Sequence, residues 1–156
     1  MAETIAGELR QAFELRAMRT QLDQFTNKVH LERATTIVRQ AKSAREAEHD
    51  DHNKTYDKRV DAAQRKLIDE AGRKNLDHTP SWATPDRFDP QSIRRRAEHS
   101  VLCDYEQRIK AINETEHRDL SALYSEAKHA RKAKNEARDG FKRAIDDQRH
   151  PHGPGR

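Results

Sequence analysis

Three Glu-x-x-His pairs are the residues whose spacing best suits metal chemistry in this chain. They are Glu46 with His49, Glu114 with His117, and Glu126 with His129. On a helix this spacing places a carboxylate and an imidazole on one face, as in four-helix bundles that hold two iron ions. Such a site also needs two further inward carboxylates and a dry interior, and pairs of this kind arise by chance in a chain so rich in Glu and His. We therefore predict solvated helix faces, with no metal and no cofactor.

Cys103, the only cysteine, lies between Leu102 and Asp104. A reactive thiol needs a neighbour that stabilises its thiolate, and the sequence offers no clear one, so we predict a packed or half-exposed thiol. No stretch gathers a nucleophile, a base and an oxyanion donor, and no glycine-rich phosphate loop occurs. We predict no enzymatic activity, no catalytic residues and no small-molecule substrate.

The strongest chemical signal is a basic run over residues 126–143, EAKHARKAKNEARDGFKR. A basic helix can follow phosphates without reading base sequence, dock on an acidic protein surface, or stay hydrated. Aromatic side chains that could stack on bases are nearly absent, which disfavours recognition of single strands. The candidate contacts for an acidic partner or for phosphates are Lys128, Arg131, Lys132, Lys134, Arg138, Lys142 and Arg143.

The composition determines what kind of structure can carry this run. Of the 156 residues, 33% are hydrophobic and 37% are charged, whereas an ordinary globular domain has about 45–50% apolar and about 25% charged residues. Long helices that bury a narrow seam are the ordered structure that such a chain can form. The single cysteine and the absence of an apolar stretch of membrane-spanning length predict a cytoplasmic protein that does not enter a membrane.

Apolar residues recur every three or four positions in two long series, which predicts an all-α, coiled-coil-like antiparallel hairpin. The first series begins Leu15, Met18, Leu22, Phe25, Val29, and the second includes Leu120, Leu123, Ala127, Ala130, Lys134, Ala137, Phe141, Ala144. We expect one elongated domain over 1–149, with an arm at 4–72, a bend at 73–89 and an arm at 90–148. Residues 150–156 are expected to form a flexible tail.

An antiparallel pairing that places Val38 opposite Leu123 has one mismatch, because Ile109 and Ile112 then face the polar residues 48–53. Burying histidines against isoleucines is costly unless each finds a partner. Either the first arm breaks near 49–53, which would give three helices, or a second copy covers the isoleucines. We favour self-association, to which Ile5, Leu9 and Phe13 near the N-terminus would add a second contact.

The entry to the second arm is predicted residue by residue. Asp89 is a suitable N-cap, and Pro90 suits the first helical position because no amide donor is needed there. Phe88 and Ile93 have the spacing of a hydrophobic staple. Trp82 has no such structural role, so it is the candidate partner contact at the bend.

These features together favour a non-enzymatic assembly or adaptor protein that bridges or spaces protein partners. An alternative is a basic accessory protein that binds DNA or RNA non-specifically through the open end of the hairpin. Residues 15–45 and 118–149 at that end hold 16 basic and 8 acidic residues, whereas residues 46–117 hold 13 basic and 16 acidic. A third reading is a component of a larger assembly that folds only when assembled.

Overall fold

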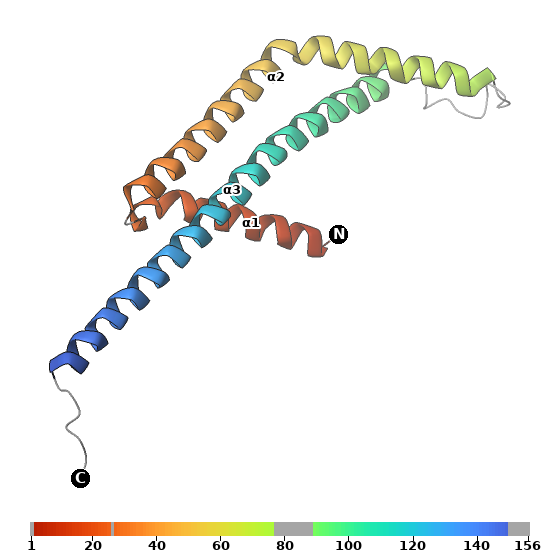
Figure 1. Cartoon of the computed structure of the whole chain (residues 1–156). Helices are drawn as coiled ribbons and strands as arrows, with labels where there is room; N and C mark the ends of the chain where they lie inside the picture. Colours follow the sequence, from red (N-terminus) through yellow and green to blue (C-terminus); the bar gives the residue numbers. More distant parts are fainter. Residues whose placement is uncertain (1, 26, 77–88, 150–156) are drawn as a thin grey trace. The chain divides into compact units, whose positions relative to one another are not determined.

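The computed structural model describes residues 2–25, 27–76 and 89–149. In chain order these form α1 (Ala2–Thr20), the 3-10 turn η1 (Leu22–Gln24), α2 (Lys28–Leu76) and α3 (Pro90–Arg149), with no strand in the described part. The predicted all-α helical hairpin is confirmed, because α2 and α3 pack against each other (Figure 1). Trp82, Phe88 and the tail at 150–156 lie outside the described residues.

The start of α3 agrees with the prediction from the sequence. A carboxylate oxygen of Asp89 accepts a hydrogen bond from the amide of Ser92 at 2.9 Å, and the carbonyl of Asp89 accepts one from the amide of Ile93 at 3.0 Å. Pro90 occupies the first helical position. The N-cap residue therefore satisfies amides that the first turn would otherwise leave without partners.

The predicted alternative of a helix break near 49–53 is wrong, since α2 runs unbroken from Lys28 to Leu76. Several polar side chains there contact α3 without a break, although Nδ1 of His52 and one terminal nitrogen of Arg108 are buried with no hydrogen-bond partner among the described residues. The ring of His52 stacks on Tyr105 with centroids 4.2 Å apart, and Nδ1 of His49 lies 3.3 Å from the hydroxyl of Tyr105. Arg108 donates a hydrogen bond of 2.8 Å to Glu48. The second helix also continues past Gly72, where the first arm was expected to end.

The first arm instead breaks between Thr20 and Lys28, inside a stretch whose heptad spacing predicted continuous helix. The side-chain oxygen of Asn27 accepts a hydrogen bond of 2.9 Å from the amide of Val29, and its carbonyl accepts one from the amide of Leu31. Asn27 is thus the N-cap of α2, a role in which Asn is strongly preferred. The predicted seam residue Val29 is 59% exposed as a result.

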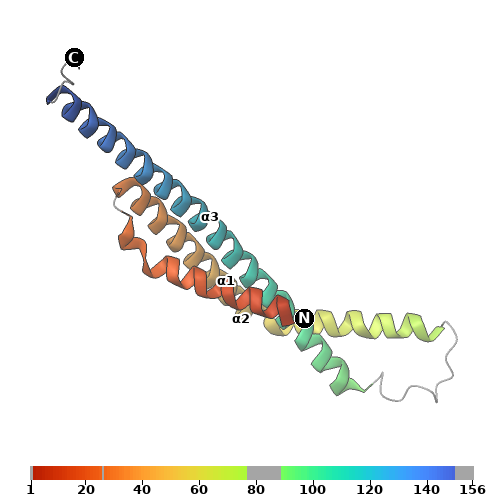
Figure 2. The ribbon, with the colours of Figure 1, turned by 90° about the horizontal axis from the view of Figure 1, so that it is seen from below.

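The chain divides into two compact units, Met1–Val38 with Glu116–Arg156 and Arg39–Thr115. In the first unit, α1 and the start of α2 lie beside α3 and form a three-helix bundle (Figures 1 and 2). Its buried core is Leu15, Phe25, Ala34, Leu120 and Leu123. Ile37, Val38, Tyr124 and Ala127 pack against this core, as the antiparallel pairing predicted for them.

The second unit has a smaller core, made by α2 and α3 alone. Val60, Ala97 and Val101 are its buried cluster, with Tyr56, Ala63 and Leu67 packed against it. The antiparallel register that places Val38 opposite Leu123 also predicts Val60 opposite Val101 or Leu102. The structure packs Val60 with Val101, whereas Leu102 is 44% exposed. None of the described helices is long and apolar enough to cross a membrane.

Candidate interaction surface at the end of α3

The last part of α3 extends past the end of the three-helix bundle (Figures 1 and 2). Every residue from Lys128 to Ala144 is exposed, whereas Leu120 and Leu123, about one to three turns earlier, are 0% and 2% exposed. At 1.5 Å per residue, the segment 128–149 is about 33 Å long. We call this segment the α3 extension.

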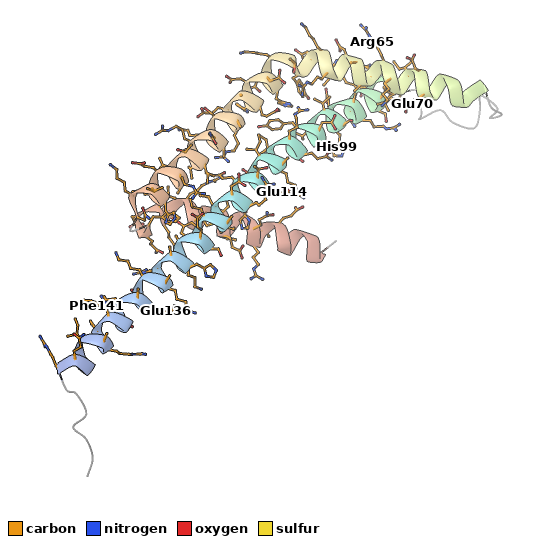
Figure 3. The ribbon with its side chains drawn as sticks, in the orientation of Figure 1. Arg65, Glu70, His99, Glu114, Glu136 and Phe141 are labelled. Atoms are coloured by element: carbon orange, nitrogen blue, oxygen red, sulfur yellow. The ribbon has the colours of Figure 1, made fainter. Side chains whose placement is uncertain are left out.

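The heptad seam of α3 continues into the extension but is not covered there. Phe141 is 69% exposed, and Figure 3 shows it on the extension with Glu136. The small apolar residues that recur at spacings of three and four form one strip along this helix. The apolar strip consists of Ala130, Ala133, Ala137, Phe141 and Ala144, and the seam position predicted between Ala130 and Ala137 is the cation Lys134, at the edge of this strip. Arg138 and Phe141 follow Leu120 and Leu123 by about five helical turns, so the face that the bundle buries continues in the extension with one cation and one apolar residue, and the alanines lie beside it.

All seven predicted cationic residues lie on the extension, and their spacing divides them into two groups. Arg131, Lys134, Arg138 and Lys142 recur at intervals of three and four, which places them in one row beside the apolar strip. We call this row the basic stripe. The other three cations share the far side of the helix with Glu136 and Asp139, and Lys132 forms an ion pair of 3.7 Å with Glu136. One edge of the extension is thus purely cationic and the other is mixed.

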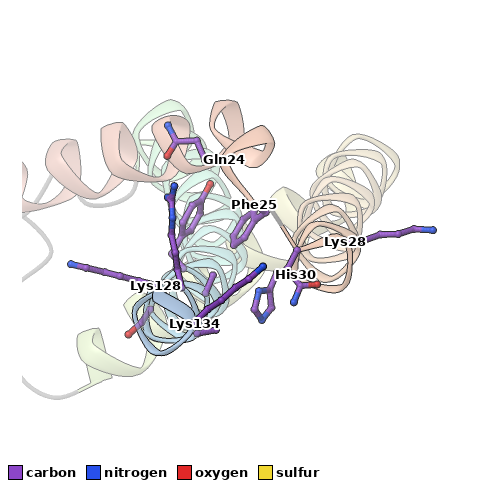
Figure 4. Close-up of a pocket in the computed structure, with 12 residues that line it drawn as sticks. Gln24, Phe25, Lys28, His30, Lys128 and Lys134 are labelled. Atoms are coloured by element: carbon purple, nitrogen blue, oxygen red, sulfur yellow. The ribbon is translucent and has the colours of Figure 1, made fainter. Parts of the chain in front are cut away.

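A groove of about 920 Å³ lies where the extension leaves the bundle. Phe25 and Tyr124 supply its aromatic lining, and Lys28, Lys128, Arg131 and Lys134 supply cations. No described residue that lines it carries a carboxylate. In Figure 4 the side chain of Lys134 reaches across towards Phe25 and His30, whereas Lys28 points away. The groove and the basic stripe therefore share Arg131 and Lys134.

The walls of the groove are fixed by contacts inside the bundle. The rings of Phe25 and Tyr124 are 4.5 Å apart, and the hydroxyl of Tyr124 donates a hydrogen bond of 2.9 Å to the carbonyl of Met18. Burial raises the pKa of Tyr124, so it stays neutral at physiological pH. The groove is thus aromatic at its base and positively charged at its rim.

Glu126, the acid that immediately precedes the extension in α3, is already engaged. Arg33 donates hydrogen bonds of 2.9 and 3.1 Å to its two carboxylate oxygens, and Nε2 of His30 lies 3.4 Å away. Hydrogen bonding from Arg33, and to a lesser degree from His30, holds the pKa of Glu126 below its usual range. Its negative charge is directed at α2 and does not neutralise the stripe.

The sequence did not predict how α1 docks on α3. Glu116 is 1% exposed, and Arg19 donates a hydrogen bond of 2.8 Å to one of its oxygens and contacts the other. This hydrogen bond raises the pKa of Arg19. Glu14 lies 3.3 Å from Nε2 of His117. The sequence signal for this contact was an acid, Glu116, at a seam position. Its partner Arg19 can be identified only in the folded structure, where α1 lies against α3.

The three Glu-x-x-His pairs do not act as pairs. His117 faces Glu14 rather than Glu114, Glu126 contacts α2 rather than His129, and His49 faces Tyr105. Among the described residues, no three or more His, Cys, Asp or Glu side chains are grouped so that they could hold a metal ion. Cys103 is half-buried, with its sulfur 3.6 Å from Nε2 of His99 one turn earlier.

The chain matches no protein-family model, no curated protein and no solved structure.

Proposed function

We propose that this protein is a non-enzymatic helical adaptor that docks a protein partner on the α3 extension. The observation that carries the proposal is the uninterrupted exposure of residues 128–144 on a helix whose seam continues through them. In proteins most of the stability of a helix comes from packing of its apolar face against neighbours, and the whole apolar strip of the extension is exposed. Its apolar strip gains burial only when another chain covers it.

A second surface supports a bridging role. Leu9 and Phe13 are one turn apart on α1 and are 57% and 69% exposed. Their spacing gives α1 an uncovered apolar face, and self-association through this face would leave the α3 extension free for the partner. The adaptor would thereby hold two or more copies of that partner at a fixed spacing, in the cytoplasm.

Site-specific photo-crosslinking in the native host tests the function. A benzoylphenylalanine in place of Ala137 on the apolar strip is expected to give a protease-sensitive crosslinked species. The matched control places the same group at Ala122, another exposed alanine of α3 that lies level with the bundle. No adduct at 137, or equal adducts at both positions, would refute docking on the extension.

The alternative function is non-specific binding of DNA or RNA by the same extension. The seven exposed cations favour it, because a row of Lys and Arg neutralises phosphates and releases counterions. It predicts a nuclease-sensitive adduct at position 137. It also predicts that affinity for a 20-base-pair duplex falls steeply with salt, with a slope that tracks the number of phosphate contacts.

A further inference from the structure

We infer that the partner contributes an acidic amphipathic helix, which lies along the α3 extension with its carboxylates on the basic stripe and its end in the groove. This inference rests on the proposed function and specifies the chemistry of the partner. Four features of the extension carry it: the continuous seam, the one-sided charge, the small side chains, and the groove at its base.

The continuous seam indicates that the missing element is a helix. Within the bundle, α2 and α1 cover the face of α3 that carries Leu120 and Leu123. The apolar strip repeats the same spacing of three and four over the next four turns of α3. Because α2 runs antiparallel to α3 and begins at Lys28, it has no residues left to cover these turns. A helix packs against such a strip because its own side chains recur with the same period.

The charges favour an acidic partner over an antiparallel second copy of the same segment. The stripe of Arg131, Lys134, Arg138 and Lys142 has no carboxylate in its row. An antiparallel second α3 extension would bring the same cations against this stripe, and like charges at a helix interface disfavour pairing. A helix with Glu or Asp beside its apolar face would place opposite charges there instead.

The small side chains favour a protein over a nucleic acid. Four of the five residues in the apolar strip are alanines, which allow the backbone of a partner helix to approach closely. A duplex would use the cations of both edges of the extension and would leave the apolar strip uncovered. Only an amphipathic protein segment uses the strip and the stripe together.

The groove supplies the place where the partner helix ends. It lies at the junction of the extension with the bundle, and the stripe residues Arg131 and Lys134 form part of its rim. Phe25 and Tyr124 at its base offer an apolar surface for one large side chain of the partner. The groove thereby sets the position of the partner along α3, which the repetitive alanine strip alone would leave free to slide.

A binding measurement with a defined probe tests the inference. The probe is a fluorescent 21-residue peptide with Leu at every a and d heptad position and Glu at most other positions. It is titrated with the full-length protein at physiological salt and followed by anisotropy. A peptide of the same composition in scrambled order, which has the charge but no apolar face, is expected to bind at least about tenfold more weakly.

Two charge-matched variants locate the contact. Arg138→Glu/Lys142→Glu reverses two cations of the stripe, and Lys132→Glu/Arg143→Glu reverses two on the mixed edge, with the same change in net charge. All four positions are exposed, and helicity is checked by circular dichroism. We expect the stripe variant to weaken peptide binding at least about tenfold and the control variant by less than about twofold. The same two double variants with Gln in place of Glu should rank the same way in peptide affinity, with smaller losses.

The outcomes separate this inference from the proposed function. Equal weakening by both variants, or equal binding of the scrambled peptide, would mean docking by net charge and would overturn the acidic helix. Tighter binding of a 20-base-pair duplex than of the peptide would also overturn it. If the acidic peptide does not bind but position 137 still crosslinks to a protein, the adaptor function stands and the inferred acidic helix is wrong. If position 137 gives no adduct, both fail.

Discussion

Residues 116–127 of α3 and the α3 extension belong to one helix with one heptad seam, yet one part is core and the other is surface. Leu120 is completely buried and Phe141 is 69% exposed, although both occupy seam positions. The difference lies in the neighbours, because α1 and α2 cover the first part and reach no further. A seam in the sequence therefore marks a face that can be buried, and its exposure marks the place where a partner is needed.

Truncation of a seam residue should have the largest effect, and only in the covered part. Leu123→Ala leaves a cavity among Leu15, Phe25 and Leu120, so we expect a loss of about 2–5 kcal/mol in the free energy of unfolding. Phe141→Ala removes a larger side chain from the extension and should cost less than about 0.5 kcal/mol. Urea unfolding followed by circular dichroism measures both. Similar losses would mean that the extension is packed in solution.

Breaking the ion pair that docks α1 should have the next largest effect. Arg19→Ala leaves the carboxylate of Glu116 buried without this cation, and we expect a loss of about 2–3 kcal/mol, reduced because Arg19 is itself 32% exposed. Arg118→Ala, which removes an exposed arginine paired with Asp119, is the control and should change stability by less than about 0.5 kcal/mol.

A compensating variant distinguishes the buried charge from general damage at this contact. Arg19→Met/Glu116→Leu replaces both charges with apolar groups of similar size and should restore most of the loss. If the double variant is as unstable as Arg19→Ala, the arginine contributes through packing rather than through charge.

A smaller and purely local effect is expected at Gly140 in the extension. A Cβ added there meets no atom within 4 Å, so Gly140→Ala should stabilise the surrounding turns by about 0.5–1 kcal/mol. Amide hydrogen exchange around residue 140 should slow by about two- to fivefold, while the unfolding of the bundle stays unchanged. Ala137→Gly should produce the opposite change. A shift in global stability from either variant would contradict an independent extension.

The smallest effect is a pH dependence confined to the bundle. The hydrogen bond from Arg10, and then that from His117, lowers the pKa of Glu14 below its ordinary value of 4.5. A carboxyl with a lowered pKa in the folded state stabilises the fold above that ordinary value and loses this contribution as the pH falls through the folded pKa. Glu14→Gln should therefore melt below the wild type at pH 6, and the difference in melting temperature should close as the pH falls through the lowered pKa of Glu14. A difference in melting temperature that persists in acid would mean that the substitution acts through side-chain packing rather than through charge.

The local signals of the sequence predicted much of the fold. Heptad spacing and composition predicted two antiparallel helices, and Asp89 with Pro90 predicted where α3 begins. The pairing of Val60 with Val101 or Leu102 followed from the same spacing. These predictions succeeded because caps and helical periodicity act over a few residues and leave little room for alternatives.

The break after Thr20 was missed for a physical reason. Leu15, Met18, Leu22 and Phe25 have heptad spacing, and all of them do pack in one core. They do so from both sides of a turn, and the cap of Asn27 competed successfully with helix continuation. Spacing alone does not distinguish one helix from two that bury the same residues, although Asn27 at the turn was a readable signal.

The sequence by itself determined that this chain is helical, where its seams lie and that residues 126–143 are strongly basic, because propensity, period and charge are local properties. Only the tertiary structure decided that α1 folds back to place Arg19 on Glu116. It also decided that α2 begins at the groove lined by Arg131 and Lys134, since the reach of one helix along another depends on where distant residues cap and turn. That geometry leaves the basic stripe and its apolar strip bare together.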